Sequence, residues 1–132
     1  MNTAEMKEAV LEFLKEFEDP DPIRLESMIS NNFVYQVIAN MPGFSEPIKG
    51  KEGMKGFAGT LKAMLPNGLN MKIGQIIAEG DHAAVQCESD TTAANGKKYQ
   101  NRYHFYFRFE GDKIAEVKEY CDTNHAREVF AS

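Results

Sequence analysis

Four strand-like runs separated by short turns fill the second half of the sequence, and this pattern limits the fold more than any other feature. The turns contain Gly80-Asp81, Asn95-Gly96 and Gly111-Asp112, residue pairs that are favoured in tight hairpins. Long strands joined by such short turns pair with their neighbours in antiparallel fashion. The runs cover residues 69–79, 82–93, 98–109 and 113–121. The pattern therefore predicts an antiparallel meander.

The first half of the sequence is predicted to be mostly helical. Apolar residues recur at helical spacing over 3–18 and 51–65, and Asp21-Pro22 is a typical start for a short helix between them. That short helix is expected to end at Asn31-Asn32. It is followed by 33–39, which is rich in β-branched and aromatic residues and is predicted to be a strand.

A last helical turn is expected over 124–130, and Asp122 is interpreted as its N-cap rather than as a catalytic acid. Gly74 lies inside a strand-like run, which is typical of a bulge that bends a sheet. Helices must then cover one face of the bent sheet, as in an α+β domain. We therefore expect a curved antiparallel sheet wrapped around three helices, with an apolar pocket at the open end of the resulting cone.

The length of the chain fits one such domain over residues 1–132, because a chain of this size buries one sizeable core. Fifteen Lys and Arg residues against twenty Asp and Glu leave a formal net charge of −5, which argues against a nucleic-acid partner. No apolar run approaches the ~18 residues of a membrane span, and the first residues lack the order of a signal peptide. We expect a cytoplasmic protein with no membrane partner.

The two cysteines, Cys87 and Cys121, are not expected to form a disulfide. They fall on the same face of strands that are separated by a third strand, which places them ~9–10 Å apart. Both are interpreted as small core hydrophobes. The three histidines share no metal-binding spacing, and no Gly-rich phosphate loop occurs. The sequence therefore predicts neither a metal nor a cofactor.

Alternation along the strands separates an inner face, under the helices, from an outer face. The expected inner residues are Ala83, Val85, Cys87, Ser89 and Thr91, then Tyr103, Phe105, Phe107 and Phe109, then Ala115, Val117, Glu119 and Cys121. The same rule places Ile114 on the outer face. Glu119 is the one acidic residue on an otherwise mainly apolar inner face.

Glu119 has two interpretations, because a carboxylate among apolar residues costs free energy unless it is hydrogen-bonded, paired or neutral. In the structural interpretation, a bulge turns the Glu119 side chain outward, or the side chain accepts hydrogen bonds at the solvent-exposed end of the cone. In the functional one, Glu119 is a general acid or base with a raised pKa. Tyr35 on the first strand is then its neighbour, with a hydroxyl that orients a water or substrate oxygen. The pattern leaves both open.

Three segments, together with the order of the elements, carry a family resemblance. They are Tyr35-Gln36-Val37, residues 45–50 (SEPIKG) and the ending 113–123 (KIAEVKEYCDT). The chain resembles the nuclear transport factor 2-like superfamily, in particular its SnoaL-like, ketosteroid-isomerase-related branch. The resemblance spans nearly the whole chain and implies a cystatin-like cone. It implies no single chemistry, because this fold carries isomerases, epoxide hydrolases, polyketide cyclases, dehydratases and non-catalytic binders.

Matched position by position, the resemblance argues against the ketosteroid isomerase mechanism. Those enzymes use a helix Tyr and a strand Asp as an oxyanion hole, and a second Asp as the base. The corresponding positions here are Phe13, Phe105 and Val37. A shift of one residue would bring Gln36 and His104 to these places, and neither restores the set. Without a base and a donor there, steroid isomerisation is not expected.

The limonene-epoxide-hydrolase pattern is matched in part. Tyr35 matches its water-activating Tyr, and Glu119 matches the first Asp of its Asp-Tyr-x-Asp ending. The positions of its Asn, Arg and second Asp hold Val37, Ser89 and Thr91. Polyketide cyclases of this fold also rely on a pocket carboxylate, so the resemblance is slightly more compatible with them.

Two functions are open at this point. One is an enzyme for a small apolar, oxygen-containing metabolite, a hydrolase, cyclase, dehydratase or isomerase in type, with Glu119 as acid–base and Tyr35 as its partner. The other is a non-catalytic ligand-binding or dimeric assembly module. An open cavity that reaches Glu119 favours the enzyme, and one filled by phenylalanines favours the binder. The expected pocket wall is Phe13, Phe17, Val37, Phe57, Leu61, Cys87, Phe105, Phe107, Val117 and Cys121.

The outer face of the sheet is expected to form a homodimer interface, because the resemblance implies one and because aromatic residues among arginines suit a polar interface. The residues concerned are Arg102, His104, Tyr106, Arg108, Lys118 and Tyr120.

Overall fold

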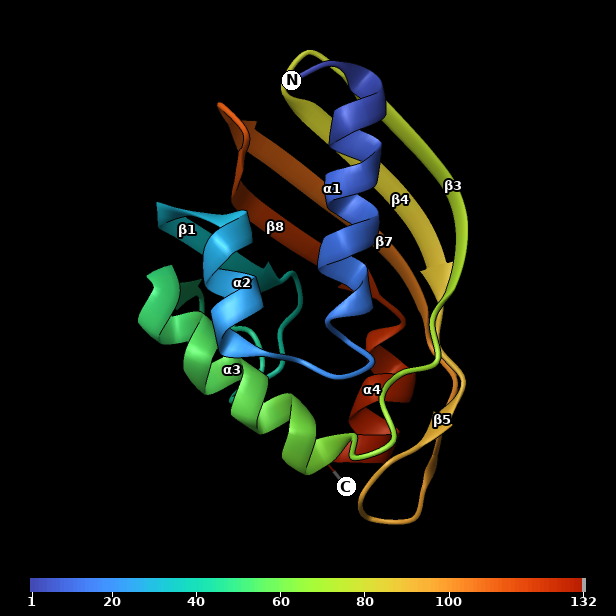
Figure 1. The fold of residues 1–132 in the computed structure, drawn as a ribbon. Helices are drawn as coiled ribbons and strands as arrows, with labels where there is room; N and C mark the ends of the chain where they lie inside the picture. Colours follow the sequence, from blue (N-terminus) through green and yellow to red (C-terminus); the bar gives the residue numbers. More distant parts are fainter. Residues whose placement is uncertain (132) are drawn as a thin grey trace.

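The computed structural model describes residues 1–131, and its elements follow one another in the predicted order (Figure 1). The helices are α1 (Thr3–Lys15), α2 (Pro22–Met28), α3 (Gly50–Met64) and α4 (Thr123–Phe130). The strands are β1 (Ile29–Val37), β2 (Ile48–Lys49), β3 (Lys72–Glu79), β4 (His82–Glu88), β5 (Thr91–Thr92), β6 (Lys98–Tyr99), β7 (Arg102–Glu110) and β8 (Lys113–Cys121). No helix within residues 1–131 is both long and apolar enough to cross a membrane.

Six of the strands form one curved sheet in the order β2-β1-β8-β7-β4-β3. The pairs β3–β4, β4–β7 and β7–β8 are antiparallel, which confirms the predicted meander. β1 instead lies parallel to β8, so the sheet is mixed and the prediction of an antiparallel sheet throughout was wrong. A long crossover links β1 to β8, and no tight hairpin therefore fixes their relative direction.

Helices α1, α2 and α3 cover one face of this sheet, which confirms the predicted α+β class (Figure 1). α1 starts at a capping box between Asn2 and Glu5 and buries an apolar stripe that includes Phe13. It ends at Lys15, before the Pro20 and Pro22 positions that no helix interior accommodates. Beyond that point the face is covered by α3 and α4, in the lower part of Figure 1.

The bend in the sheet has a local cause at Gly74. The β3–β4 register shifts between Ile73 and Ile76, as the predicted bulge requires. A Cβ at Gly74 would lie 2.9 Å from the carbonyl oxygen of Gln86. The close approach of β4 therefore demands glycine at this position.

A second irregularity changes the inner face of β8. The β7–β8 register shifts between Arg108 and Phe109, so that Ile114 lies opposite Phe109. Ile114 and Ala115 are both buried, and the prediction that Ile114 faces outward was wrong. The extra residue reverses the alternation before this point, whereas the alternation after it, up to Cys121, is as predicted.

Two of the predicted strands are interrupted near Asn101. The runs 82–93 and 98–109 each break, and their distal parts form the separate ribbon β5–β6. Asn101 is 1% exposed. Its side-chain oxygen accepts hydrogen bonds from the backbone N–H groups of Arg102 and Asp122, at 2.7 and 3.0 Å. These bonds satisfy the backbone where the ladder stops.

The start of β1 was also predicted too late. α2 ends at Met28 and the strand begins at Ile29, so Asn31-Asn32 lies inside β1 and is exposed. A register shift between Ile29 and Val34 accommodates these two residues.

The cysteines lie as predicted. Cys87 and Cys121 both pair with Tyr103, from opposite sides, and are therefore separated by strand β7. Both are free thiols.

Candidate functional site

A pocket of about 370 Å³ occupies the end of the interior that α1 does not cover. Its walls come from α3, the end of β8, the segment 38–47 and α4. Of the residues expected to line it, those that do are Phe17, Val37, Phe57, Leu61 and Cys121. The rest of the wall is also mainly apolar and includes Met41, Phe44, Met64, Leu65, Leu69 and Phe130.

Glu119 lines this pocket and is half-buried. Strand β8 places it on the inner face, opposite Val37 of β1, so no bulge turns it outward. Tyr35 pairs with Val117 on the same face, one side-chain position away. Its hydroxyl donates a hydrogen bond to Glu119 Oε1. The structure thus brings together the two residues that were proposed as catalytic.

Tyr35 is held rigidly by the aromatic core. Its side chain is fully buried, and its ring lies 4.8 Å from the ring of Phe57 and 6.4 Å from that of Phe13, between centroids. The hydroxyl consequently contacts Glu119 from the core side, and Tyr35 itself does not line the pocket. Tyr35 is therefore suited to position the carboxyl group rather than to touch a ligand.

The environment of Glu119 disfavours its charged form. Burial raises the pKa of Glu119 above its ordinary value of 4.5, while the hydrogen bonds from Tyr35 and Cys121 act in the opposite direction and only partly offset this. Burial and the neighbouring Glu119 also hold the pKa of Tyr35 well above its ordinary value, so the phenol keeps its proton and acts as a donor. Glu119 is thus a carboxyl group that can both give and take a proton closer to neutral pH than an exposed one.

The thiol of Cys121 lies beside this carboxyl group and lines the same pocket. Burial, with a smaller effect of Glu119, raises the pKa of Cys121 to about 12. The group therefore remains a neutral thiol and is not an activated nucleophile. Within residues 1–131, no three His, Cys, Asp or Glu side chains are arranged to hold a metal ion.

Comparison with known proteins agrees with this architecture. The model of the SnoaL-like domain matches residues 10–117, most of the chain. The chain belongs to the SnoaL-like domain family. No curated protein matches the sequence significantly.

Solved structures share the fold of this SnoaL-like protein. A candidate SnoaL-like polyketide cyclase from Jannaschia sp. CCS1 is 16% identical, with a TM-score of 0.82 over 98% of this chain and 94% of the other. TerC, co-crystallised with polyporic acid, is 20% identical, with a TM-score of 0.83 over 97% and 99%. An LEH-like epoxide hydrolase from M. tuberculosis is 19% identical, with a TM-score of 0.77 over 98% and 91%. At these identities the likeness establishes a common NTF2-like fold.

Half of the predicted pocket wall lies elsewhere in this SnoaL-like protein. Five residues are packed in the core away from the pocket, and the expectation that they line it is corrected: Phe13, Cys87, Phe105, Phe107 and Val117. Each is at most 4% exposed. The alternation placed the four strand residues among them correctly on the inner face, but α1 lies over that part of the sheet (Figure 1) and packs its buried stripe, which includes Phe13, against it.

Several pocket residues were not foreseen from the sequence. Met41 and Phe44 come from the irregular segment 38–47, which has no periodic pattern to interpret. Ala126 and Phe130 come from α4. This helix has only eight residues, and its sequence pattern does not indicate which element it packs against. Tyr103 was placed on the inner face but not in the pocket, where it lies together with Tyr99.

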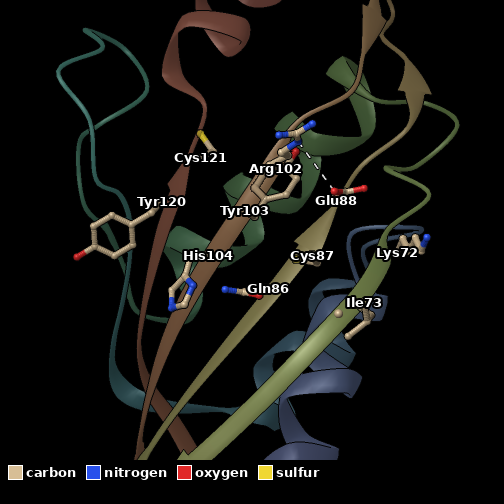
Figure 2. Close-up of a pocket in the computed structure, with 11 residues that line it drawn as sticks. Lys72, Ile73, Gln86, Cys87, Glu88, Arg102, Tyr103, His104, Tyr120 and Cys121 are labelled. Carbon is tan, nitrogen blue, oxygen red and sulfur yellow. Dashed lines mark ion pairs between the residues drawn. The ribbon is translucent and has the colours of Figure 1, made fainter.

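A larger cavity, of about 560 Å³, lies on the outer side of the sheet (Figure 2). Figure 2 shows Gln86, His104 and Tyr120 side by side on three neighbouring strands, and the ion pair of 3.9 Å between Arg102 and Glu88. These side chains are exposed, with no carboxyl group shielded from water. The interior pocket therefore offers the better setting for chemistry, although it is smaller.

Proposed function

We propose that this SnoaL-like protein binds a small, mainly apolar metabolite in the interior pocket and catalyses a proton transfer on it, with Glu119 as the acid–base. The observation that carries the proposal is the carboxyl group of Glu119 in an apolar pocket of about 370 Å³, held in place by the buried Tyr35. A perturbed carboxyl group in such a pocket is typical of an acid–base site.

The number of acidic groups favours one type of reaction. Glu46 also lines the pocket but is exposed, so Glu119 is the one shielded carboxyl group among the lining residues. Ser89 and Thr91 stand where the epoxide hydrolase pattern has its Arg and second Asp, and they provide no second acid. A single carboxyl group suits a reaction in which it first removes a proton and then returns it at another position, as in a cyclisation or an isomerisation through an enol.

The geometry assigns each group its part. The charged form of Glu119 removes a proton from the substrate, and its neutral form returns one. Tyr35 holds Oε1 and leaves the remaining oxygen for the ligand or the nearby Cys121 thiol. The apolar wall excludes water, which strengthens the electrostatic interactions of the reacting groups. The neighbouring polyketide cyclase candidate and epoxide hydrolase lend support as proteins of the same fold.

Exchange of α-protons on uncharged cyclic ketones in D₂O, followed by proton NMR, tests the proposal. We expect the protein to accelerate exchange and Glu119→Gln to lose at least about 100-fold of that acceleration, because general acid–base catalysis contributes on this scale. Glu116→Gln is the matched control, since Glu116 lies on the same strand but pairs with Arg108 on the outer face. Equal exchange by Glu119→Gln and the wild type would remove Glu119 from the mechanism.

A non-catalytic ligand-binding module is the second candidate. The apolar residues Phe13, Val37 and Phe105 at the ketosteroid isomerase positions favour it, because the usual polar groups of that chemistry are missing. Ketones that bind in the pocket without any acceleration of exchange would support this candidate over the enzyme.

We also propose a homodimer through the outer face of the sheet. Tyr106 is half-buried there beneath the ammonium group of Lys118, 5.6 Å from its ring centroid, and Tyr120 is 42% exposed. An exposed tyrosine among charged residues suits a polar interface. The mass in solution at micromolar concentration, from light scattering, is expected to be twice 14.9 kDa, and a monomer mass would remove the proposal.

A further inference from the structure

The pocket wall carries a second polar group, separate from Glu119. Tyr99 and Tyr103 both line the pocket and are 5% and 6% exposed. The Tyr103 hydroxyl lies 3.0 Å from Ser89 Oγ, and the Tyr99 oxygen accepts a hydrogen bond of 3.0 Å from Asn101 Nδ2. Ser89, Tyr103 and Tyr99 thus form a buried group of hydroxyls beside the pocket.

These hydroxyls have more hydrogens than acceptors. Each of the three carries one hydrogen, but only the bond between Ser89 and Tyr103 joins two of them. The backbone N–H of Asn101 donates to Ser89 Oγ and its side-chain nitrogen donates to Tyr99, while Asn101 Oδ1 already accepts from two backbone N–H groups. The Tyr99 hydroxyl therefore has no acceptor for its own hydrogen among residues 1–131.

Burial indicates the direction of the bond between Ser89 and Tyr103. If Tyr103 were the donor, the Ser89 hydrogen would be unsatisfied in the interior, since Ser89 is 4% exposed and does not line the pocket. Burying a donor in this way is unfavourable. With Ser89 as the donor, the remaining hydrogens belong to the two tyrosines that line the pocket, where a ligand or water can accept them.

The ring of Tyr99 is fixed by its neighbours. It stacks on His125 with a centroid distance of 5.5 Å and an interplanar angle of 8°, and it makes an edge contact of 4.8 Å with Phe130. A donor held in this way costs little entropy on binding, which is a property of a preorganised recognition group.

We propose that the Tyr99 hydroxyl donates a hydrogen bond to an oxygen of the bound ligand and so selects molecules with a carbonyl or ether oxygen over hydrocarbons of the same shape. The inference rests on the proposed function of the pocket and adds the class of its ligand. Tyr99 is the specificity-determining residue, and Ser89, Tyr103 and Asn101 position it.

The charges of the pocket define the ligand further. The ionisable acids in the wall are Glu119 and Glu46, and none of the described lining residues is Lys, Arg or His. A carboxylate or phosphate ligand would bring a negative charge into a mainly apolar pocket whose described lining residues offer no cation to pair with it. The expected ligand is therefore uncharged, with an oxygen acceptor on an apolar frame.

Binding of a matched pair of probes tests this inference. 2-Tetralone and tetralin differ by one carbonyl oxygen, and their affinities for the full chain can be measured by NMR titration. We expect Tyr99→Phe to lower the ratio of 2-tetralone to tetralin affinity about three- to tenfold, the range for one neutral hydrogen bond. The affinity for tetralin itself should change little. Tyr106→Phe, which removes a hydroxyl on the outer face, should leave the ratio unchanged.

Other outcomes overturn the inference in distinguishable ways. Equal losses for both probes in Tyr99→Phe, with a lower thermal midpoint, would show a structural role only. A ratio that falls in Tyr103→Phe but not in Tyr99→Phe would make Tyr103 the donor instead of Tyr99. If both probes bind and no variant alters the ratio, the pocket remains and the donor is rejected. If neither probe binds the wild type, the inference falls together with the ligand pocket, whatever the effect of Glu119→Gln on exchange.

Discussion

The interior of this molecule has two ends that are built from the same strands, one packed shut and one open. At the closed end Phe13, Phe105 and Phe107 are each at most 1% exposed, and the rings of Phe13 and Phe107 meet edge to face at 5.6 Å. At the open end, β7 and β8 continue past Tyr103 and Glu119, and a pocket of about 370 Å³ remains.

The difference lies in what covers the sheet. A regular helix, α1, lies over the closed end and packs its apolar stripe into the side chains of the strands (Figure 1). Beyond Lys15 the cover is made by α3, α4 and the segment 38–47, which come from distant parts of the chain. Separate segments of irregular shape fill space less completely than one helix does. The candidate chemistry therefore lies where regular packing ends.

Removal of an aromatic ring at each end should sharpen this comparison most. We expect Phe107→Ala to lower the free energy of unfolding by about 3–5 kcal/mol, because it leaves a cavity in a fully packed core. Phe44→Ala removes a half-buried ring that already borders open space, and we expect a loss of about 1 kcal/mol or less. Urea unfolding of both variants measures these values. Equal losses would contradict the distinction between a packed and an open end.

The helix that closes the open end depends on its cap. Asp122 accepts a hydrogen bond of 3.2 Å from the backbone N–H of His125 at the start of α4, as the sequence predicted. Asp122→Ala should lower the free energy of unfolding by about 1 kcal/mol. Asp112→Ala, in the exposed turn between β7 and β8, is the control and should change it by less than about 0.5 kcal/mol. A loss no larger than that of the control would show that the cap does not stabilise α4.

The acid of the open end should make stability depend on pH. The pKa of Glu119 is higher in the folded chain than its ordinary value of 4.5, so the folded state binds the proton more tightly than the unfolded state. The free energy of unfolding therefore falls as the pH rises from 4.5 through the raised pKa, and it stays lower at higher pH. Glu119→Gln, which has no ionisable group at this position, should not show this decrease. Its thermal midpoint should match that of the wild type near pH 4 and exceed it at pH 8.

The contrast with Glu116 tests the cause of that effect. Glu116 lies on the same strand, on the outer face, with Arg108 Nε 3.6 Å away. Glu116→Gln should bring no gain in thermal midpoint that grows with pH. If both variants gain equally at pH 8, relief of the overall negative charge explains the result, and burial of Glu119 does not.

The sequence predicted what depends on local pattern. The turns and the alternation of side chains gave the meander and placed Glu119 inward, because the bulge at Ala115 comes before it and leaves the rest of β8 in register. The cap at Asp122 and the bulge at Gly74 are equally local. Recognition of the family added the cone and its pocket, and the match to the SnoaL-like domain confirms the family.

What the sequence did not predict depends on contacts between distant segments. The parallel pairing of β1 with β8 has no local signal, since a long crossover separates the strands. Burial alternates without a break from Tyr99 to Phe109, so Tyr99 shares the inner face with Tyr103. Tyr99 was missed because the predicted inner face began only at Tyr103, and because alternation alone does not indicate which inner residues border open space. Phe13 and Phe107 were assigned to the pocket because a pattern distinguishes a face but not a position along the interior.

The smallest effect that we expect is a difference in reactivity between the two thiols, Cys121 in the pocket wall and Cys87 in the packed interior. The pKa of Cys87 and that of Cys121 are each raised to about 12, mainly by burial, so both should react slowly with iodoacetamide at pH 8. Cys121 is half-buried in the pocket wall, whereas Cys87 is 4% exposed. We expect Cys121 to be modified first, as identified by mass spectrometry of the digested chain.

Protection by a ligand completes this test of the open end. 2-Tetralone bound in the pocket should slow modification of Cys121 and leave that of Cys87 unchanged, because only Cys121 lines the pocket. The variant Cys87→Ala, which keeps the pocket wall intact, isolates the Cys121 signal. Both thiols also line the outer cavity. Modification of Cys87 before Cys121, or no protection of Cys121 by 2-tetralone, would mean that the reagent reaches the thiols from that side and not through the interior pocket.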